Sequence, residues 1–242
     1  MCFSLEADLA AAAVLTPVGV LAVREARRAR RLLPLAALPL LLAAHQAIEA
    51  VVWLGLDGHL DPGIQAAAVR AYLLIAAPLL PMLVPVALIL AEDVPARRRA
   101  MWPFAAIGWV VGLWLLWVVL ANPVGARELD HAIDFRTEPS LEIAAGSVYL
   151  VATLVPAALS SHRWLRAFGA VNLVGAVVVF AAHKAAFASL WCFWAALASV
   201  LVLVHLRRTR QRRHRGGPPA RRRWRNAPEV VSRLSRSAGS SG

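Results

Sequence analysis

Long apolar runs, each bounded by charged residues, constrain this chain more than any other feature of its sequence. A helix needs roughly 20 apolar residues to cross the ~30 Å hydrocarbon core of a bilayer. Runs of about this length predict transmembrane helices over residues 8–23, 33–56, 66–91, 102–121, 141–160, 167–183 and 188–206. We therefore expect an all-α integral membrane bundle of seven transmembrane helices over residues 1–206. The 60% apolar composition argues against a water-soluble domain.

The charges between these runs predict how the bundle is oriented. Three short segments, Arg24–Arg31, Arg97–Arg99 and Arg163–Arg166, are rich in arginine, whereas the charges of the loops at 57–65 and 122–140 are mostly acidic. Because short basic loops stay in the cytoplasm, we expect the N-terminus outside and the C-terminus inside. Ala, Val, Leu, Arg and Pro dominate the composition, as is typical of GC-rich bacterial genomes, so we expect a multi-pass protein of the bacterial inner (plasma) membrane.

The C-terminal segment, residues 207–242, has a different composition. It contains 12 of the 26 Lys and Arg residues and supplies most of the net charge of +12. A segment this polar cannot bury a core, so we expect a disordered, Arg-rich cytoplasmic tail. Besides the lipid bilayer itself, the expected partner is the anionic headgroups of the inner leaflet. No nucleic-acid binding is expected, because the topology already explains the arginines.

Few ionisable residues fall inside the predicted spans, and His45 and Glu49 stand out among them. At positions i and i+4 the two side chains lie on one face of the second span. An imidazole beside a carboxylate is a candidate half-site for zinc or copper, or a general acid/base pair. The alternative is structural: Glu49 forms an ion pair with Arg70 of the third span, and His45 hydrogen-bonds across the bundle.

Other residues able to bind a metal are predicted on the same outward side. These are Cys2, His131, His183 and Cys192, which with His45 and Glu49 form the candidate metal set. Glu49, His45 and Cys2 are the candidate catalytic residues; after removal of Met1, Cys2 would present both an amine and a thiol. The simpler alternatives are solvated loop positions for the two histidines, and either a Cys2–Cys192 disulfide or two free thiols.

The third predicted span contains three prolines, and two further polar residues are predicted near the cytoplasmic side. Pro78, Pro81 and Pro85 lie inside the third span, where each removes a backbone donor, so we expect this helix to bend or open in its middle. Broken helices can mark substrate sites in transporters. Asn172 and His162 are predicted toward the cytoplasmic side, away from the outer site.

Three short motifs carry a resemblance to known proteins. Met1-Cys2-Phe3-Ser4, His45-Gln46-Ala47-Ile48-Glu49 followed by Trp53-Leu54-Gly55, and Ser189-Leu190-Trp191-Cys192 occur in this order. Together they resemble an uncharacterised family of bacterial multi-pass membrane proteins, which implies no activity but favours a linked role for Cys2 and Cys192. The helix count is loosely similar to that of seven-helix membrane hydrolases such as alkaline ceramidases and adiponectin receptors. Their several zinc-binding histidines have no clear counterpart here.

The sequence supports three functional hypotheses. The first is metal-assisted hydrolysis of a lipid or another outer-leaflet substrate, with Glu49 as ligand or base. The second is a sensor or a small-solute, proton-coupled carrier, in which Glu49 titrates and the proline-interrupted helix moves. The third is a structural membrane protein held by the Glu49–Arg70 ion pair and the Cys2–Cys192 disulfide.

Overall fold

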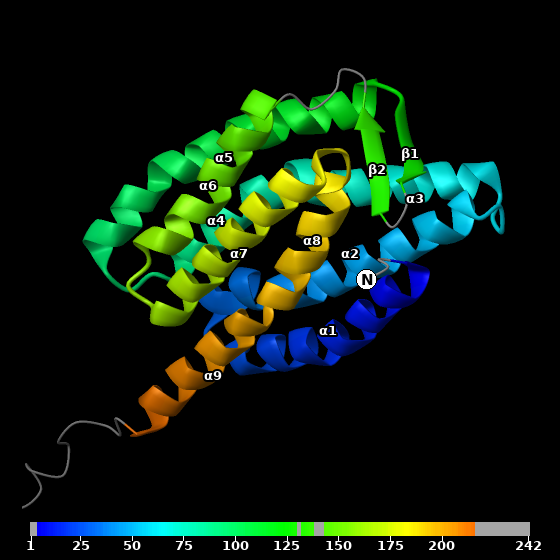
Figure 1. The fold of residues 1–242 in the computed structure, drawn as a ribbon. Coiled ribbons are helices and arrows are strands. Elements are labelled where there is room, and N and C mark those ends of the chain that lie inside the picture. The colour runs from blue at the N-terminus through cyan, green and yellow to red at the C-terminus, as the bar shows by residue number, and fades with distance from the viewer. Residues whose placement is uncertain (1–3, 130–131, 138–142, 216–242) are drawn as a thin grey trace, which may run out of the picture. The chain divides into compact units, whose positions relative to one another are not determined.

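A computed structural model describes residues 4–129, 132–137 and 143–215 of the chain (Figure 1). Within these ranges the chain is mostly helical. The helices are α1 (Leu5–Ala26), α2 (Leu33–Leu56), α3 (Pro62–Leu74), α4 (Leu80–Ala91), α5 (Pro95–Ala121), α6 (Ile143–Leu159), α7 (Arg163–Ala182), α8 (Phe187–Ala198) and α9 (Val200–Arg215).

The helices agree with the predicted apolar runs. Six helical stretches in the described residues are long and apolar enough to cross a membrane: Leu5–Ala26, Arg30–Leu56, Pro62–Ala91, Pro95–Ala121, Arg163–Ala182 and Phe187–Gln211. A seventh apolar helix, Gly146–Leu159, is shorter. The prediction of a helical bundle is therefore confirmed, and it contains several helices that could span a membrane.

The segment predicted as an outer loop departs from the all-α expectation. It contains two antiparallel strands, β1 (Val124–Leu129) and β2 (Ala132–Thr137), which pair in one two-stranded sheet. Ile133 and Thr137 are buried, whereas Asp134 is partly exposed and accepts a hydrogen bond from Arg136 (2.9 Å). This alternation of apolar and charged residues is the period of a strand with one face packed on the protein.

The last helix extends past residue 206, where the last predicted span ends. Helix α9 continues to Arg215, because arginine is a good helix former and the first glycines after the apolar run are Gly216 and Gly217. Most of the segment predicted to be disordered lies outside the described residues.

Most helices pack against the helices that precede and follow them in the sequence, and α2 contacts several others as well. It contacts α1, α3, α4 and α8, while α4 contacts α5 and α6, and α7 packs between α6 and α8 (Figure 1). The hairpin contacts α2, α3 and α8. Residues of α1, α2, α3 and α8 can therefore meet beneath the hairpin.

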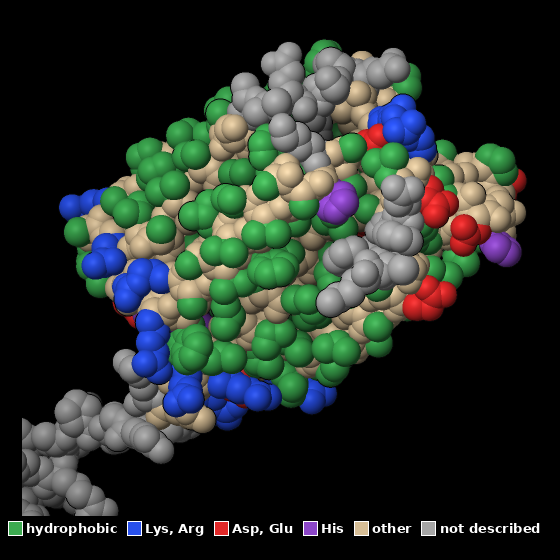
Figure 2. Space-filling view, in the orientation of Figure 1, with side chains coloured by type: hydrophobic (Ala, Val, Ile, Leu, Met, Phe, Trp, Pro, Cys, Tyr) green, Lys and Arg blue, Asp and Glu red, His purple; other side chains and the backbone are tan. Residues whose placement is uncertain are grey.

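Opposite charges gather at opposite ends of the bundle. Figure 2 shows Lys and Arg side chains where α1 ends and where α5 and α7 begin, and acidic side chains at the other end, with an apolar surface between them. Exposed tryptophans of α5, including Trp102, Trp109 and Trp117, contribute to that apolar surface. An apolar belt between two charged ends is the kind of surface that contacts the hydrocarbon core of a bilayer in membrane proteins.

The expected break in the third span is confirmed. Residues Ile75–Leu79 form a π-helical turn between α3 and α4. The N–H of Leu80 donates to Ile75 instead of Ala76, and the next residue, Pro81, has no N–H. The carbonyl oxygen of Ala76 thereby loses its helical donor, and the hydroxyl of Tyr149 in α6 donates to it at 3.0 Å. A side chain of a neighbouring helix thus stabilises the opened turn.

Beyond the break, α4 and α5 pack very closely. Proline at position 85 leaves the carbonyl of Pro81 without a helical donor, and this oxygen approaches Gly108 of α5. A Cβ at position 108 would overlap that oxygen, and one at Gly112 would lie 2.9 Å from the carbonyl oxygen of Pro78. Small residues permit such close approach between membrane helices.

We predict that Gly108→Ala destabilises the bundle, because α4 and α5 would have to separate to admit the methyl group. The cost should be about 2 kcal/mol, which lowers Tm by about 4–8 °C in a chain of this size. The matched control is Gly146→Ala in α6, where a Cβ meets nothing within 4 Å. Thermal unfolding in detergent measures both, and equal effects of the two substitutions would contradict this account of the contact.

At the basic end of the bundle, Glu92 joins two turns that are far apart in the sequence. Its Oε1 accepts hydrogen bonds from the N–H of Val94 (2.9 Å) and the hydroxyl of Ser161 (2.6 Å). Its Oε2 accepts from the N–H of Ser161 (2.7 Å) and the hydroxyl of Ser160 (3.1 Å). Burial alone would raise the pKa of Glu92, but these donors favour the carboxylate and lower the pKa below its ordinary value of 4.5.

We predict that Glu92→Gln lowers stability by about 2 kcal/mol at neutral pH, because an amide cannot accept all four hydrogen bonds. A carboxyl with a lowered folded-state pKa stabilises the fold above its unfolded pKa and loses this contribution as the pH falls through its folded pKa. The Tm difference between wild type and variant should therefore be constant above about pH 5 and shrink below about pH 4. The control is Asp93→Asn, whose partly exposed ion pair with Arg31 should contribute little.

Candidate functional site

The C-terminal half of α2 carries a row of buried polar side chains on the face turned into the bundle. His45 and Gln46 are fully buried, and Glu49 is 1% exposed. Leu38, Leu42, Gln46, Glu49 and Trp53 follow one another at three- or four-residue steps, so they form a single stripe along the helix. The stripe changes from apolar to polar between Leu42 and Gln46.

Glu49 is the centre of this group. Its Oε2 accepts a hydrogen bond from the side-chain amide of Gln46 at 3.3 Å. Tyr72 of α3, and Ser189 and Cys192 of α8, also lie beside Glu49. Four polar side chains from three helices thus surround one carboxylate inside the bundle.

A second carboxylate faces Glu49 from α1. Asp8 is 4% exposed, and its Oδ2 accepts a hydrogen bond from the indole N–H of Trp53 at 3.0 Å. Among the described residues, no Lys or Arg forms an ion pair with Asp8 or Glu49. Two like charges in a low-dielectric interior repel strongly, so the pair favours a proton or a cation between them.

An aromatic stack covers the outer end of the site. The ring of His45 stacks on Tyr72 with 4.0 Å between ring centroids, and Tyr72 stacks on Phe135 of β2 at 3.9 Å. Phe135 belongs to the hairpin, so the hairpin closes the stack. We call Asp8, His45, Gln46, Glu49, Tyr72, Ser189 and Cys192 the polar cluster.

The polar cluster holds most of the buried polar atoms that lack a partner. In the described residues these atoms are Nδ1 and Nε2 of His45, Oε1 of Gln46, Oε1 of Glu49, the hydroxyl oxygen of Tyr72 and, elsewhere, Nε1 of Trp164. Leaving a buried polar group without a partner costs about 1–3 kcal/mol. Several together in one place are characteristic of a binding site for an ion or a polar molecule.

The predicted metal-binding and catalytic residues only partly converge. His45, Glu49 and Cys192 face the same interior region, whereas His183 is exposed at the end of α7. Cys2 and His131 lie outside the described residues, so their catalytic and metal-binding roles, and the Cys2–Cys192 disulfide, stay predictions. Within the described part of the chain, no three His, Cys, Asp or Glu side chains group closely enough to hold a metal ion. A zinc or copper site is therefore also still a prediction.

The predicted Glu49–Arg70 ion pair is not formed. Arg70 makes no salt bridge in the described structure, and the α3 residue that faces Glu49 is Tyr72. Residues two apart on a helix point roughly 200° away from each other, so α3 cannot direct both side chains to Glu49. The sequence predicts how far along the helix Arg70 lies, but not which face of α3 is turned toward Glu49.

Sequence reasoning missed Asp8, Tyr72 and Ser189 as members of this site. Asp8 lies in the first turn of α1, and an acidic residue at the start of an apolar helix was a usable signal. Tyr72 and Ser189 are ordinary residues in membrane helices. Only the packing of α3 and α8 against α2 shows that they face Glu49.

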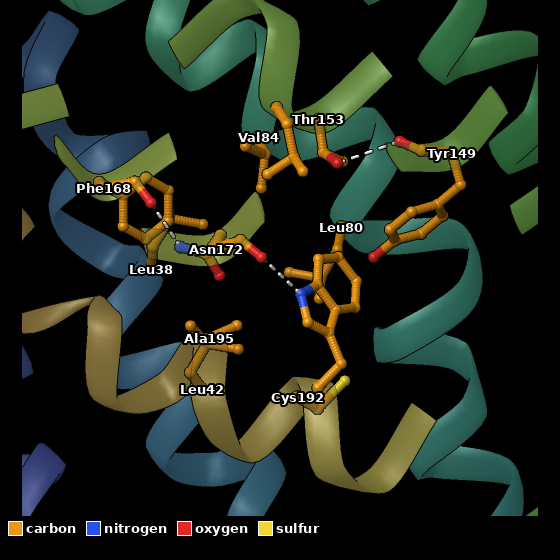
Figure 3. Close-up of a pocket in the computed structure, with 12 residues that line it drawn as sticks. Leu38, Leu42, Leu80, Val84, Tyr149, Thr153, Phe168, Asn172, Cys192 and Ala195 are labelled. Carbon is orange, nitrogen blue, oxygen red and sulfur yellow. Dashed lines mark hydrogen bonds between the residues drawn. The ribbon is translucent and has the colours of Figure 1, made fainter. Parts of the chain in front are cut away.

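An apolar cavity shares Cys192 with the polar cluster (Figure 3). It has a volume of about 40 Å³. Its lining residues come from α2, α4, α6, α7 and α8: Leu38, Leu42, Leu80, Val84, Tyr149, Thr153, Leu154, Phe168, Asn172, Trp191, Cys192 and Ala195. Asn172 donates to the carbonyl oxygen of Phe168 at 2.8 Å, so its amide N–H is already engaged. Asn172 was expected far from the outer site. It lines the same cavity as Cys192, which lies beside Glu49.

Comparison with known proteins places the chain in a family. Residues 1–217 match the model of DUF6629, a family of unknown function, and the chain belongs to this family. No curated protein and no solved structure matches the chain.

We predict that Arg70→Ala changes the stability of the protein by less than about 0.5 kcal/mol, because Arg70 forms no ion pair with the buried carboxylates. Thermal unfolding should show a Tm within about 2 °C of the wild type. A large loss of stability, rescued by the double substitution Arg70→Ala and Glu49→Gln, would restore the ion-pair interpretation.

Proposed function

We propose that this member of a family of unknown function is a multi-pass protein of the bacterial inner membrane that binds a cation at Glu49. In the proposed topology, seven spans place the N-terminus outside and the C-terminus inside. The arginine-rich turns at one end of the bundle and the acidic loops at the other support this orientation. The polar cluster then lies in the outward half of the membrane.

The observation that carries the proposal is the excess of acceptors in the polar cluster. Glu49 and Asp8 are both buried without a basic partner in the described structure. Neutral donors from Gln46, Tyr72 and Ser189 lie beside Glu49 but supply no positive charge, and Oε1 of Glu49 and Oε1 of Gln46 have no hydrogen bond of good geometry. An uncompensated carboxylate in hydrocarbon is costly. A bound proton or cation removes this cost, whereas an anion would increase it.

Carriage or sensing of the cation agrees with the construction of the site. The π-helical turn at Ile75–Leu79 begins three residues after Tyr72, and the hydroxyl of Tyr149 donates a hydrogen bond to its Ala76 carbonyl oxygen. Such turns can rearrange at low cost, and they are frequent at functional sites. A change in the charge at Glu49 could thereby alter the bend of the third span through Tyr72.

A second candidate function rests on His45. Both of its ring nitrogens lack a partner, and it lies one helical turn from Glu49, which is the arrangement expected of a pair of metal ligands. If the cation is zinc or copper, the function supported is metal-assisted hydrolysis of an outer-leaflet substrate, with Glu49 as ligand or base. The proposed partner of the C-terminal tail is anionic lipid in both cases.

We predict that cation binding raises the Tm of the wild-type protein and that Glu49→Gln abolishes this shift. The purified protein in detergent is titrated with ammonium, Na⁺, K⁺, Zn²⁺ and Cu²⁺ chlorides at constant ionic strength. An occupied site stabilises the folded state by an amount that grows with the ratio of ligand concentration to Kd, about 2.7 kcal/mol at 100 times Kd. A shift with Zn²⁺ or Cu²⁺ that His45→Ala also removes favours the hydrolase.

The matched control is Asp57→Asn, which removes an exposed carboxylate just beyond the end of α2 and should leave the shift unchanged. A carrier or sensor is supported if a monovalent cation gives the shift and His45→Ala retains it. The absence of any cation-dependent shift in the wild type, or an equal shift in Glu49→Gln, would overturn the proposed function.

A further inference from the structure

We infer that the cation is an organic ammonium ion with a short alkyl substituent, held with its ammonium group at Glu49 and its alkyl group in the apolar cavity. This inference rests on the proposed cation site and names its substrate class. It follows from Cys192, which belongs to the polar cluster and also lines the cavity, from the size of the cavity and from the number of free acceptors.

Helix α2 carries residues of both the cavity and the polar cluster. Leu38 and Leu42 line the cavity, and Gln46 and Glu49, the next residues of the same stripe, belong to the polar cluster. One face of one helix therefore passes from an apolar wall to a carboxylate within about two turns. A molecule lying along this face meets apolar side chains at one end and acceptors at the other.

Helix α8 repeats this order on the opposite wall. Ser189 and Cys192 lie beside Glu49, and Cys192 and Ala195 line the cavity. These three residues follow at three-residue steps along one face of α8. Figure 3 shows Cys192 and Ala195 facing the cavity from one side, with Leu80 and Tyr149 on the other. Cys192 is thus the residue at which the two compartments meet.

The size of the cavity limits the apolar part of the ligand. Its volume of about 40 Å³ is well above the ~10–15 Å³ that a single water molecule requires. It is well below the ~150 Å³ of a cavity that binds benzene. The lining is almost entirely apolar, so water is a poor occupant. A short alkyl group fits both limits, whereas a lipid acyl chain does not.

The free acceptors match the other end of the ligand. An ammonium group has three N–H donors and a positive charge. The polar cluster offers Oε1 of Glu49, Oε1 of Gln46 and, in its neutral form, one ring nitrogen of His45. These three acceptors, one of them an oxygen of Glu49, satisfy the three N–H donors, and the negative charge of Glu49 and Asp8 balances the positive charge. A bare alkali ion would leave the apolar cavity unused.

The experiment compares a series of primary ammonium ions on the full-length protein in detergent. Apparent Kd values for ammonium, methyl-, ethyl-, propyl-, butyl- and hexylammonium are obtained from thermal-shift titrations. Burial of each methylene should tighten binding by about fourfold until the cavity is full, after which affinity should stop rising or fall. We expect the optimum at ethyl- or propylammonium.

Two variants test the assignment of the alkyl group to the cavity. Ala195→Leu fills the cavity, so it should remove the gain from the alkyl group while retaining the response to ammonium. Leu42→Ala enlarges the cavity, so it should move the optimum to a longer chain. The matched control is Ala170→Leu on the exposed face of α7, which should leave the series unchanged. Leu42→Ala keeps the test decisive if Ala195→Leu does not fold.

The outcomes separate this inference from the proposed function on which it rests. Stabilisation by inorganic cations that depends on Glu49 but shows no dependence on alkyl chain length overturns the inference alone. So does a chain-length optimum that both cavity variants leave unchanged. The lack of any Glu49-dependent stabilisation, by inorganic and organic cations alike, overturns both.

Discussion

The cost of burying a polar group without a hydrogen-bond partner is the constraint on which the rest of this structure depends. A polar group inside the bundle therefore needs a partner from the protein itself. In the opened turn at Ile75–Leu79, a carbonyl oxygen accepts a hydrogen bond from Tyr149. At the basic end of the bundle, the carboxylate of Glu92 accepts hydrogen bonds from two turns. The polar cluster around Glu49 does not meet this need, and several of its atoms have no partner. Among the described residues, most of the buried side-chain polar atoms without a partner therefore lie in the polar cluster.

Much of the helical framework could be predicted from sequence, because membrane spans are encoded by local composition. The apolar runs and the three prolines of the third span were sufficient to predict the helices and the break. The hairpin was missed because two six-residue strands within a polar connection give a weak signal beside apolar runs of about 20 residues. The extension of α9 to Arg215 could not be predicted from hydropathy, which indicates where an apolar span ends and not where the helix that contains it ends.

The candidate site was predicted only along single helices. The i and i+4 spacing of His45 and Glu49 follows from helix geometry, and the structure places both side chains inside the bundle. Which residues of other helices face them depends on helix rotation, which the sequence does not specify. For that reason Arg70 was chosen as a partner of Glu49 instead of Tyr72, and Asp8 was overlooked. Cys192 was grouped with Glu49 correctly in space, while its position at the edge of an apolar cavity required the packing of five helices.

The stacking of Phe135 on Tyr72 has a consequence for the rate at which the site exchanges its occupant. The ring belongs to a hairpin between α5 and α6, and it rests on the aromatic face that ends at His45. Entry from this direction requires the hairpin to lift and two ring faces to separate, and exit requires the same. For the proposed cation site, the hairpin would therefore act on the association and dissociation rates together, and the residues beneath it would set the equilibrium affinity. Exchange rate and selectivity would then depend on different segments of the chain.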